Sequence, residues 1–582
     1  MTQKNKGYRY LQLAFQRCKS GLYGIAAFSF LINLLMLAGP LYMMLVYDRV
    51  LASQSVPTLV GISVLIGGLL LAQGILTMIR SRMLIRVGNR LSQSMEEVVF
   101  HAHVEKSVQK GASSAQTLRQ LKTLREFLGG STLPVLFDAP WALIYIGVVY
   151  LLHPVLGLIS LAGFVVLLLC GIANEFFTRG RLREAAEWSH ESGKLLGDTM
   201  RNAEVVSAQG MTARLFKRWT KLESRAQYRQ SKASDVSSDF GAMSRTVRLI
   251  LQSMILGTGA YLAIQGQLSP GAIIAASIIM ARGLAPAEQA ITGWKQWLTA
   301  RAAYRTLKLD LMEFMLEQPR MTLPKPKGSL IVRQAYIAAP NSTKPILNNV
   351  SFSLAAGDVL AIIGPSGSGK SALARSLVAA WPAMRGTIRL DGADLTQWSK
   401  NQLGDAIGYL PQDVELFDGT VRENIARFAD EIDDREVVEA AKKAGAHGLI
   451  LSLPNGYETR IGESGRHLSG GQRQRIGLAR AMFGNPCLIV LDEPNSNLDS
   501  LGDVALHDAI RSWKEEGRTA IIVSHRPSAV ELAHKVLALD NGRVRAFGPK
   551  DQILKTTDRG TMIASGIASG MSQSRTAAVA AE

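Results

Sequence analysis

The sequence predicts an α-helical membrane domain of six transmembrane helices with long cytosolic helical extensions, followed by an α/β domain. Three observations support this prediction. Of the 582 residues, 47% are hydrophobic and 19% charged; the long apolar runs all lie in the first half; and short β-rich segments alternate with helical ones in the second half. This composition, with only 3 cysteines, excludes a largely disordered chain and a disulfide-stapled secreted module.

Six apolar segments are the predicted membrane spans, because a bilayer core needs roughly 20 apolar residues in a helix. They are Gly21–Val46, Pro57–Ile79, Leu133–Leu152, Val155–Ile172, Ile250–Ile264 and Ala272–Leu284, of which the last two are the least hydrophobic. Basic residues precede the first segment, as in a secretory signal peptide. Its apolar stretch is too long for a signal peptide and no small-residue cleavage site follows, so we expect an uncleaved span.

The distribution of charge sets the expected orientation. Residues 1–320 carry 35 Lys/Arg against 19 Asp/Glu, whereas residues 321–582 carry 30 against 28. The basic excess therefore accompanies the spans, which favours a membrane protein over a nucleic-acid-binding protein. The segments Arg80–Gly130 and Arg179–Phe240 hold nine and twelve Lys/Arg, while the three short connections hold only Arg49. We expect both long segments, the N-terminus and the second half in the cytosol.

Both long segments are rich in Leu, Arg, Glu, Ala and Gln and contain few turn signals. This pattern predicts that the spanning helices continue into the cytosol as helical hairpins. Three prolines in EQPRMTLPKPKG indicate a linker before the second domain. The predicted organisation is a cytosolic N-terminal segment at 1–20, the membrane domain at 21–316, the linker at 317–328, the α/β domain at 329–556 and a disordered tail at 557–582.

A phosphate-binding loop follows the strand-like segment Val359–Ile363. Its residues 364–371 read GPSGSGKS and fit GxxxxGK[ST] in the strand–loop–helix context that this motif requires. Backbone N–H groups and the next helix's N-terminus bind phosphate, Lys370 adds a positive charge, and Ser371 is suited to Mg²⁺. The predicted nucleotide-binding residues are Gly364, Pro365, Ser366, Gly367, Ser368, Gly369, Lys370, Ser371 and Ala372.

Two further motifs follow. The apolar run CLIVL ends in Asp492 and Glu493, which predicts a buried parallel strand whose carboxylates meet the nucleotide. Asp492 suits Mg²⁺, and Glu493 suits polarising the water that attacks the γ-phosphate. Between the loop and this strand lies LSGGQ at 468–472, whose serine hydroxyl, glycine amides and helix N-terminus form an anion site for a phosphate that arrives from outside.

Together with Gln412, Asp499 and His525, these motifs make the second domain similar to the α/β P-loop ABC ATPase domain of ABC transporters. The resemblance implies a homodimer with two composite sites for ATP and Mg²⁺, in which LSGGQ of one subunit binds the γ-phosphate on the opposite loop. The LSGGQ residues assigned to ATP are Ser469, Gly470, Gly471 and Gln472.

The resemblance also implies roles for single residues. Gln412 contacts the metal and water and couples them to the membrane domain, His525 contacts the γ-phosphate, and Asp499 lies in the loop that links the two sites. The predicted catalytic residues are Glu493, His525 and Gln412, and the predicted metal-binding residues are Ser371, Gln412 and Asp492.

The chain further resembles the PrtD-like ABC exporters of type I protein secretion systems. The resemblance lies in GPLYMMLVYDRVLASQSVPTL, LREFLGGSTLPVLFDAPWALIYI, RNAEVVSAQGM, GYLPQDVELFDGTVRENIARF and LDEPNSNLDS. It implies a bacterial inner-membrane protein whose cytoplasmic ATPase drives export of an unfolded polypeptide with a C-terminal signal, such as a protease or lipase. With about twenty residues before the first span, we expect the subfamily that lacks an N-terminal peptidase-like domain.

The implied partners are a second copy, a periplasmic adaptor (membrane fusion protein), an outer-membrane TolC-like duct, the unfolded substrate and membrane lipid, with no nucleic acid. An exporter of lipid or small amphipathic molecules is the alternative with the same architecture. A soluble ATPase that acts on DNA is a third interpretation, which the predicted spans oppose.

The sequence leaves several roles open for the charged residues near the spans. Arg282 lies about 13 residues, or roughly 20 Å, from the last external turn. Glu288 follows it at a spacing of six. We expect Arg282 to face a wet cavity, a partner carboxylate or a bound polypeptide, or to form a structural ion pair or reach the headgroups. Asp138 is expected either to cap a helix whose first turn contains Pro140 or to have a functional role.

Overall fold

The computed structural model describes residues 6–110, 116–313, 322–340, 342–462, 465–498, 500–524 and 527–557. Contacts divide the chain into two compact units. Helices α1 to α11 form the first unit, apart from the end of α4 beyond Val104, and strands β1 to β10 belong to the second. The limits of the five segments proposed from the sequence stay a prediction.

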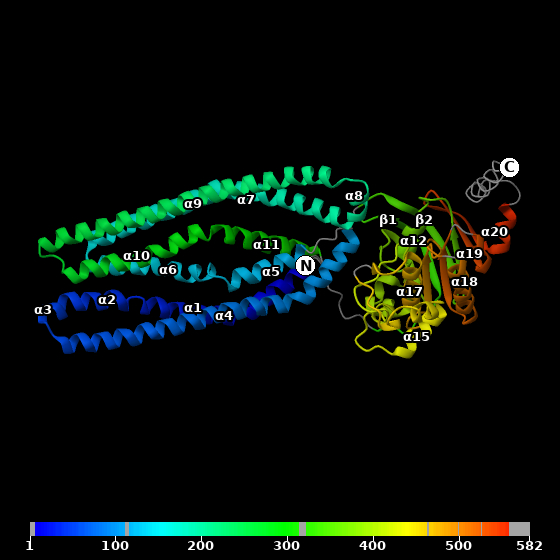
Figure 1. Cartoon of the computed structure of the whole chain (residues 1–582), viewed down its shortest axis with the longest axis horizontal. Helices are drawn as coiled ribbons and strands as arrows, with labels where there is room; N and C mark the ends of the chain where they lie inside the picture. Colours follow the sequence, from blue (N-terminus) through cyan, green and yellow to red (C-terminus); the bar gives the residue numbers. More distant parts are fainter. Residues whose placement is uncertain are drawn as a thin grey trace. The chain divides into compact units, whose positions relative to one another are not determined.

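All secondary-structure elements among the described residues of the first unit are helices. Its elements are α1 (Lys6–Leu35), α2 (Ala38–Leu45), the π-helix η2 (Val46–Val50), α3 (Leu51–Ser53), α4 (Val56–Lys110), α5 (Gln116–Gly129), α6 (Leu133–Leu152), α7 (Pro154–Arg201), α8 (Ala203–Ala208), α9 (Thr212–Ile264), α10 (Pro270–Thr292) and α11 (Trp294–Glu313). Figure 1 shows the long helices of this unit running side by side, with α7 next to α9. Six helical segments of the described chain are long and apolar enough to cross a membrane, which confirms the predicted six spans.

Three of these helices are much longer than a membrane span. Helices α4, α7 and α9 contain 55, 48 and 53 residues. At about 1.5 Å per residue they are roughly 70–80 Å long, whereas the bilayer core is about 30 Å thick. The predicted extension of the spanning helices beyond the membrane is therefore confirmed. The short helix α8 connects α7 to α9, and the other predicted hairpin turn, at 111–115, lies outside the described residues.

The external turn after the first span, η2, makes hydrogen bonds to the N-terminus of α10, the last span. Ser269 caps α10, where its Oγ accepts from the N–H of Ala272 at 3.2 Å. The Asp48 carboxylate, on η2, accepts from the Ser269 hydroxyl at 2.6 Å and from the N–H of Gly271 at 2.8 Å. An anion at a helix N-terminus satisfies amides that the helix itself leaves unpaired. This carboxylate therefore stabilises both the cap and the contact between the two turns.

A buried polar cluster joins α1, α4 and α6. The Arg80 guanidinium donates to the two carboxylate oxygens of Asp138 at 3.0 and 3.2 Å, and the Asn33 amide donates to the same carboxylate at 2.7 Å. The Tyr145 hydroxyl donates to the Asn33 backbone carbonyl at 2.8 Å. Arg80, Asn33 and Tyr145 are all buried. Charges within a membrane domain are costly unless they are paired in this way.

The predicted cap at Asp138 is wrong. Helix α6 begins at Leu133, so Asp138 lies in its second turn and Pro140 lies inside the helix. Proline is tolerated inside membrane helices because neighbouring groups satisfy the backbone carbonyl that it leaves unpaired. The carboxylate therefore serves an ion pair with another helix instead of the end of its own.

Glu288 does not serve as a counter-charge for Arg282. Glu288 accepts from Arg248 on α9 at 2.9 Å, so its charge is already balanced. Arg282 is exposed in the single chain, and its Nη1 lies 3.9 Å from the Met36 sulfur. A role of Arg282 in the export path stays a prediction.

Replacing Asp138 with asparagine should destabilise the membrane unit. Asp138→Asn keeps the side-chain shape but leaves the buried Arg80 guanidinium without its counter-charge, which costs about 3 kcal/mol. The thermal unfolding midpoint of the full chain in detergent measures this loss. Arg183→Gln removes an exposed ion pair with Glu187 and should leave the midpoint nearly unchanged. Equal midpoints for the two variants would contradict the structural role of the cluster.

The second unit contains two sheets among its described residues. Its strands are β1 (Leu330–Ala338), β2 (Pro345–Leu354), β3 (Val359–Ile363), β4 (Arg385–Leu390), β5 (Ala393–Asp394), β6 (Ile407–Leu410), β7 (Leu488–Asp492), β8 (Thr519–Val523), β9 (Lys535–Asp540) and β10 (Arg543–Pro549). Its helices are α12 (Lys370–Leu377), η3 (Leu395–Gln397), α13 (Lys400–Ala406), α14 (Val421–Ile425), α15 (Asp434–Lys443), α16 (His447–Leu451), η4 (Gly456–Glu458), α17 (Gly470–Met482), α18 (Ser500–Glu515), α19 (Pro527–Leu532) and α20 (Lys550–Thr557).

The larger sheet has the order β10-β9-β3-β8-β7-β6, and the smaller, antiparallel one has the order β2-β1-β4-β5. Strands β9, β3, β8, β7 and β6 are parallel to their neighbours in this series. Alternate side chains of β3 belong to two hydrophobic clusters, Val359 and Ala361 to one and Leu360 and Ile362 to the other. Both faces of the larger sheet are therefore covered, and the carboxyl ends of β3 and β7 reach the same edge.

Candidate nucleotide site

The phosphate-binding loop connects β3 to α12 and has a backbone conformation that requires glycine. Gly364, Gly367 and Gly369 have φ values of +152°, +81° and +97°. A Cβ on Gly364 would lie 2.2 Å from the Leu539 carbonyl oxygen, and one on Gly369 would lie 2.5 Å from Leu347 Cδ2. Both contacts are too short for any other residue. The loop therefore approaches the neighbouring strands closely.

Lys370 begins α12 with its side chain buried beneath the loop. Its ammonium donates to the carbonyls of Gly364 and Pro365, both at 2.9 Å. Burial lowers the pKa of Lys370, and the carboxylates of Glu493 and Asp492 oppose this effect. A lysine held in this way offers a positive charge to a phosphate in the loop without a change of side-chain conformation.

Asp492 ends β7 and meets the first turn of α12. Its Oδ1 accepts from the Ser371 hydroxyl at 3.1 Å, while its buried Oδ2 finds no hydrogen-bond partner among the described residues. Burial raises the pKa of Asp492; the Ser371 hydrogen bond opposes the rise and the Glu493 charge adds to it. An unsatisfied carboxylate oxygen beside a hydroxyl is an oxygen donor set that fits Mg²⁺.

Glu493 follows in a strained conformation. Its φ of +52° lies in the left-handed region, which non-glycine residues rarely adopt. The N–H of Glu493 donates to the Val523 carbonyl at 2.9 Å, and its Oε2 accepts from the Gln412 amide at 2.9 Å. The backbone turn directs the carboxylate away from the strand and toward the segment after β6, where Gln412 lies. The structure thus brings Lys370 and Ser371 together with Asp492, Glu493 and Gln412, three predicted site residues that are distant in the sequence.

The LSGGQ residues, called the signature from here on, cap the start of α17, which is the signature helix. The Ser469 Oγ accepts from the N–H of Gln472 at 3.2 Å, and the Gln472 side chain accepts from the N–H of Ser469 at 2.8 Å. This reciprocal pair is a capping box. Ser469 is exposed, and no described hydrogen bond joins Ser469 or Gln472 to the chain's own phosphate-binding loop. Asp499 and His525 lie outside the described residues, so their assigned roles stay predictions.

Sequence reasoning missed Gln474, which supports the loop behind Glu493. Gln474 is buried in α17, and its amide donates to the Pro494 carbonyl while its Oε1 accepts from the N–H of Asn497 at 3.0 Å. It therefore joins the signature helix to the segment that follows Glu493. The signal was weak, because a glutamine in a basic helix is usually a solvated residue.

Arg427 is a second residue that the sequence did not reveal. Its guanidinium donates to the carbonyls of Arg480 at 3.0 Å and of Ala481 and Phe483 at 3.1 Å, and it also donates to Gly404. Burial lowers the pKa of Arg427, which Asp405 opposes, yet an arginine stays charged at neutral pH. A cation on the last carbonyls of α17 stabilises the C-terminal end of the signature helix.

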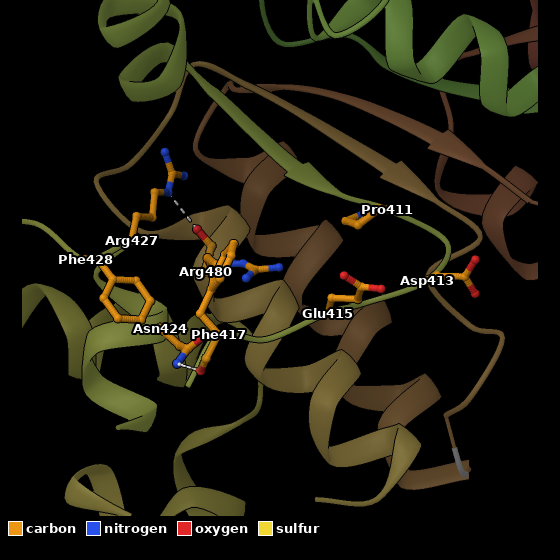
Figure 2. A pocket seen from close by; sticks show the side chains of 8 residues that line it. All are labelled: Pro411, Asp413, Glu415, Phe417, Asn424, Arg427, Phe428 and Arg480. Carbon is orange, nitrogen blue, oxygen red and sulfur yellow. Dashed lines mark hydrogen bonds between the residues drawn. The ribbon is translucent and has the colours of Figure 1, made fainter. Parts of the chain in front are cut away.

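A hollow of about 380 Å³ adjoins Gln412. Figure 2 shows Asp413 and Glu415 on one side of this hollow and Arg427 and Arg480 on the other. The remaining lining residues are Pro411, Phe417, Asn424 and Phe428. Charges of both signs beside two phenylalanines suit a polypeptide segment better than a nucleotide.

Comparison with known proteins identifies the family. Residues 347–496 match the ABC transporter family and residues 22–284 match the ABC transporter transmembrane region. The type I secretion system ATP-binding protein PrsD of Rhizobium meliloti (strain 1021) is 42% identical over 543 residues, which is 93% of each chain. This chain belongs to the ABC transporters of type I secretion systems. The resemblance predicted from its motifs is confirmed.

More distant relatives have the same type of name. The leukotoxin translocation ATP-binding protein LktB of Mannheimia haemolytica is 28% identical over 91% of this chain and 76% of its own. The exotoxin translocation ATP-binding protein PaxB of Pasteurella aerogenes is 28% identical over 91% of this chain and 75% of its own. A solved bacterial Atm1-family ABC exporter with ATP bound has the same fold, with a TM-score of 0.81 at 22% identity over 95% of this chain and 99% of that one.

As a member of this family the transporter is a multi-pass inner-membrane protein with an ATPase domain in the cytoplasm, and it couples ATP hydrolysis to transport. The predicted fold, location and ATPase activity are thereby confirmed.

Gln474→Ala should slow turnover and leave ATP affinity almost unchanged. The variant removes the contacts to Pro494 and Asn497 but does not touch the phosphate-binding loop, so we expect kcat to fall roughly tenfold with little change in KM for ATP. Steady-state ATPase assays measure both constants. Gln402→Ala is the matched control, because Gln402 also donates to a backbone carbonyl, that of Leu323 at 3.0 Å, away from this loop. Equal kinetics in the two variants would contradict the positioning role.

Proposed function

We propose that two copies of this transporter enclose two ATP molecules and use their hydrolysis to export an unfolded polypeptide. The observation that carries this proposal is the state of the signature helix. Ser469 caps α17 and is exposed at its N-terminus, an anion site that is not bonded to the loop of its own chain. A phosphate bound to the loop of a second copy completes this anion site. The homodimer is therefore the smallest assembly that contains complete ATP sites.

Within each proposed composite site the residues have distinct tasks. Gly364 to Ala372 bind the phosphates through loop amides, and Lys370 supplies the fixed positive charge. Glu493 holds a water for attack on the γ-phosphate and accepts its proton, while Gln412 orients that carboxylate through the bond at 2.9 Å. By family resemblance, His525 contacts the γ-phosphate and Asp499 links the two sites.

We assign Mg²⁺ to the oxygens of Ser371, Asp492 and Gln412. When bound, this ion neutralises phosphate charge and polarises the phosphoryl group. The chain's own contribution is the hydrogen bond from Ser371 to Asp492 at 3.1 Å, which fixes the carboxylate before the ion arrives. The buried Oδ2 of Asp492 is the oxygen that gains a partner.

For the cargo, we propose an unfolded protein that carries an uncleaved C-terminal signal, such as a protease or lipase. The names of three relatives support it: one is a type I secretion protein, and the others translocate a leukotoxin and an exotoxin. The cargo then passes to a periplasmic adaptor and a TolC-like outer-membrane duct. Closure of the ATPase dimer moves the spans through the long cytosolic extensions of α4, α7 and α9.

Glu493→Gln tests the assigned water-activating residue. The amide cannot accept a proton, so we expect ATP to bind normally while hydrolysis stops and a closed dimer accumulates. Nucleotide-binding and phosphate-release assays on the full chain distinguish the two effects. Lys370→Ala is the comparison variant, because it should lose ATP binding itself. A Glu493→Gln protein that hydrolyses ATP at the normal rate would refute the role.

The export function is tested in proteoliposomes that contain the full chain. We expect ATPase activity to be stimulated by the C-terminal fragment of a cargo protein, that is, a protein that is encoded beside this exporter and secreted by it. An N-terminal fragment of equal length should have no effect. Transport is measured as the amount of fragment that becomes protected from protease inside the same proteoliposomes. Stimulation by lipids or small amphipathic molecules, with none by the polypeptide, would overturn the proposed cargo in favour of a small-molecule exporter.

A further inference from the structure

A second hollow lies within the membrane unit, between α7, α9 and the junction of α10 with α11. Its volume is about 280 Å³, close to the lower end of the range for small-molecule sites. Hydroxyl groups make up much of its wall, from Ser234, Ser237 and Ser238 on α9 and from a threonine on each of α7 and α10. Arg245 and Lys295 add two positive charges, and none of its lining residues is acidic. The hollow therefore favours an anion.

Its depth corresponds to the cytosolic headgroups of the bilayer. Thr292 lies at the end of α10, roughly 33 Å along the helix from the external turn at Pro270. Arg245 lies roughly 29 Å from the external end of α9, and Thr178 roughly 36 Å from the external end of α7. Since the hydrocarbon core is about 30 Å thick, three independent helices bring their lining residues to the inner boundary of the membrane. Trp294, at the same level, is a residue type enriched there.

Several donors of this hollow are not used by the chain. The Trp294 Nε1 is buried and has no hydrogen-bond partner among the described residues. Within the described chain the hydroxyls of the three serines make no hydrogen bond, and neither Arg245 nor Lys295 forms an ion pair. The acidic residue one turn before Thr292, Glu288, is engaged by Arg248 at 2.9 Å. A buried donor without a partner is unfavourable, so this arrangement calls for an acceptor from outside the chain.

We propose that this hollow binds the phosphate headgroup of an anionic phospholipid of the inner leaflet. Arg245 and Lys295 balance the phosphate charge, while the Trp294 indole and the Ser238 hydroxyl, two turns of α9 from Arg245, donate to its oxygens. Basic pockets between membrane helices on the cytoplasmic side recognise such headgroups. The adjoining surface suits acyl chains, because Leu249, one turn from Arg245 toward the membrane, is 58% exposed. This apolar continuation favours a lipid over free phosphate or an acidic peptide.

Native mass spectrometry of the full chain in detergent, titrated with phosphatidylglycerol or phosphatidylcholine, tests the proposal. We expect the wild type to bind phosphatidylglycerol more tightly. The double variant Arg245→Gln/Lys295→Gln should weaken this binding roughly 30-fold, because each cation near the headgroups contributes about a factor of five. Trp294→Phe keeps the ring and removes only the N–H, so we expect a roughly tenfold loss. Basal ATPase activity shows that the variants are folded.

The matched control is Arg179→Gln/Arg183→Gln. It removes the same charge from α7 at nearly the same depth, from two exposed side chains outside the hollow. This control should bind phosphatidylglycerol like the wild type. Equal losses in the two double variants, or no preference for phosphatidylglycerol, would overturn the site. Competition by inorganic phosphate at lipid-like concentrations would reassign it to free phosphate. Normal lipid binding combined with failed export in the Arg245/Lys295 variant would reassign it to the cargo polypeptide.

Discussion

A buried ammonium and a buried carboxylate at the edge of one parallel sheet are the constraint on which the nucleotide site depends. Lys370 and Asp492 are far apart in the sequence, yet β3 and β7 are separated in the sheet only by β8. Both charges are unfavourable in an apolar interior. The chain stabilises them with loop carbonyls and with the Ser371 hydroxyl. Phosphate and a divalent cation then complete a charge balance that the fold has already prepared, so that little reorganisation accompanies nucleotide binding.

How much could be predicted from the sequence depended on how local each signal was. The phosphate-binding loop is eight consecutive residues, and the spans are continuous apolar runs, so both were predicted. Gln474 and Arg427 act through backbone carbonyls and amides that are distant in the sequence, and no residue pattern marks such contacts. The cap at Asp138 was wrong for a related reason. A proline at a helix start and a proline inside a membrane helix have the same sequence signature, and only the partner on another helix, Arg80, distinguishes them.

Two ion pairs join helices of the membrane unit, Arg80 with Asp138 and Arg248 with Glu288. Pairing of this kind lowers the cost of placing charges among membrane helices. Arg245 and Lys295 lack such a partner within the described chain, and the anionic lipid proposed for their hollow supplies the opposite charge. Helices α4, α7 and α9 continue well beyond the length that the bilayer core requires.

Cross-linking between two copies tests the shared nucleotide site most directly. One copy carries Ser366→Cys, the other carries Ser469→Cys, both also carry Glu493→Gln, and the three native cysteines are replaced. In a dimer that contains one copy of each kind, the two cysteines lie on a phosphate-binding loop and on the signature helix of the other copy, and mass spectrometry distinguishes this cross-link from one between identical copies. The account predicts a cross-linked dimer when ATP and Mg²⁺ are present and little without them. A cross-link that is absent or independent of ATP, in a protein whose parent hydrolyses ATP at the full rate, would contradict it.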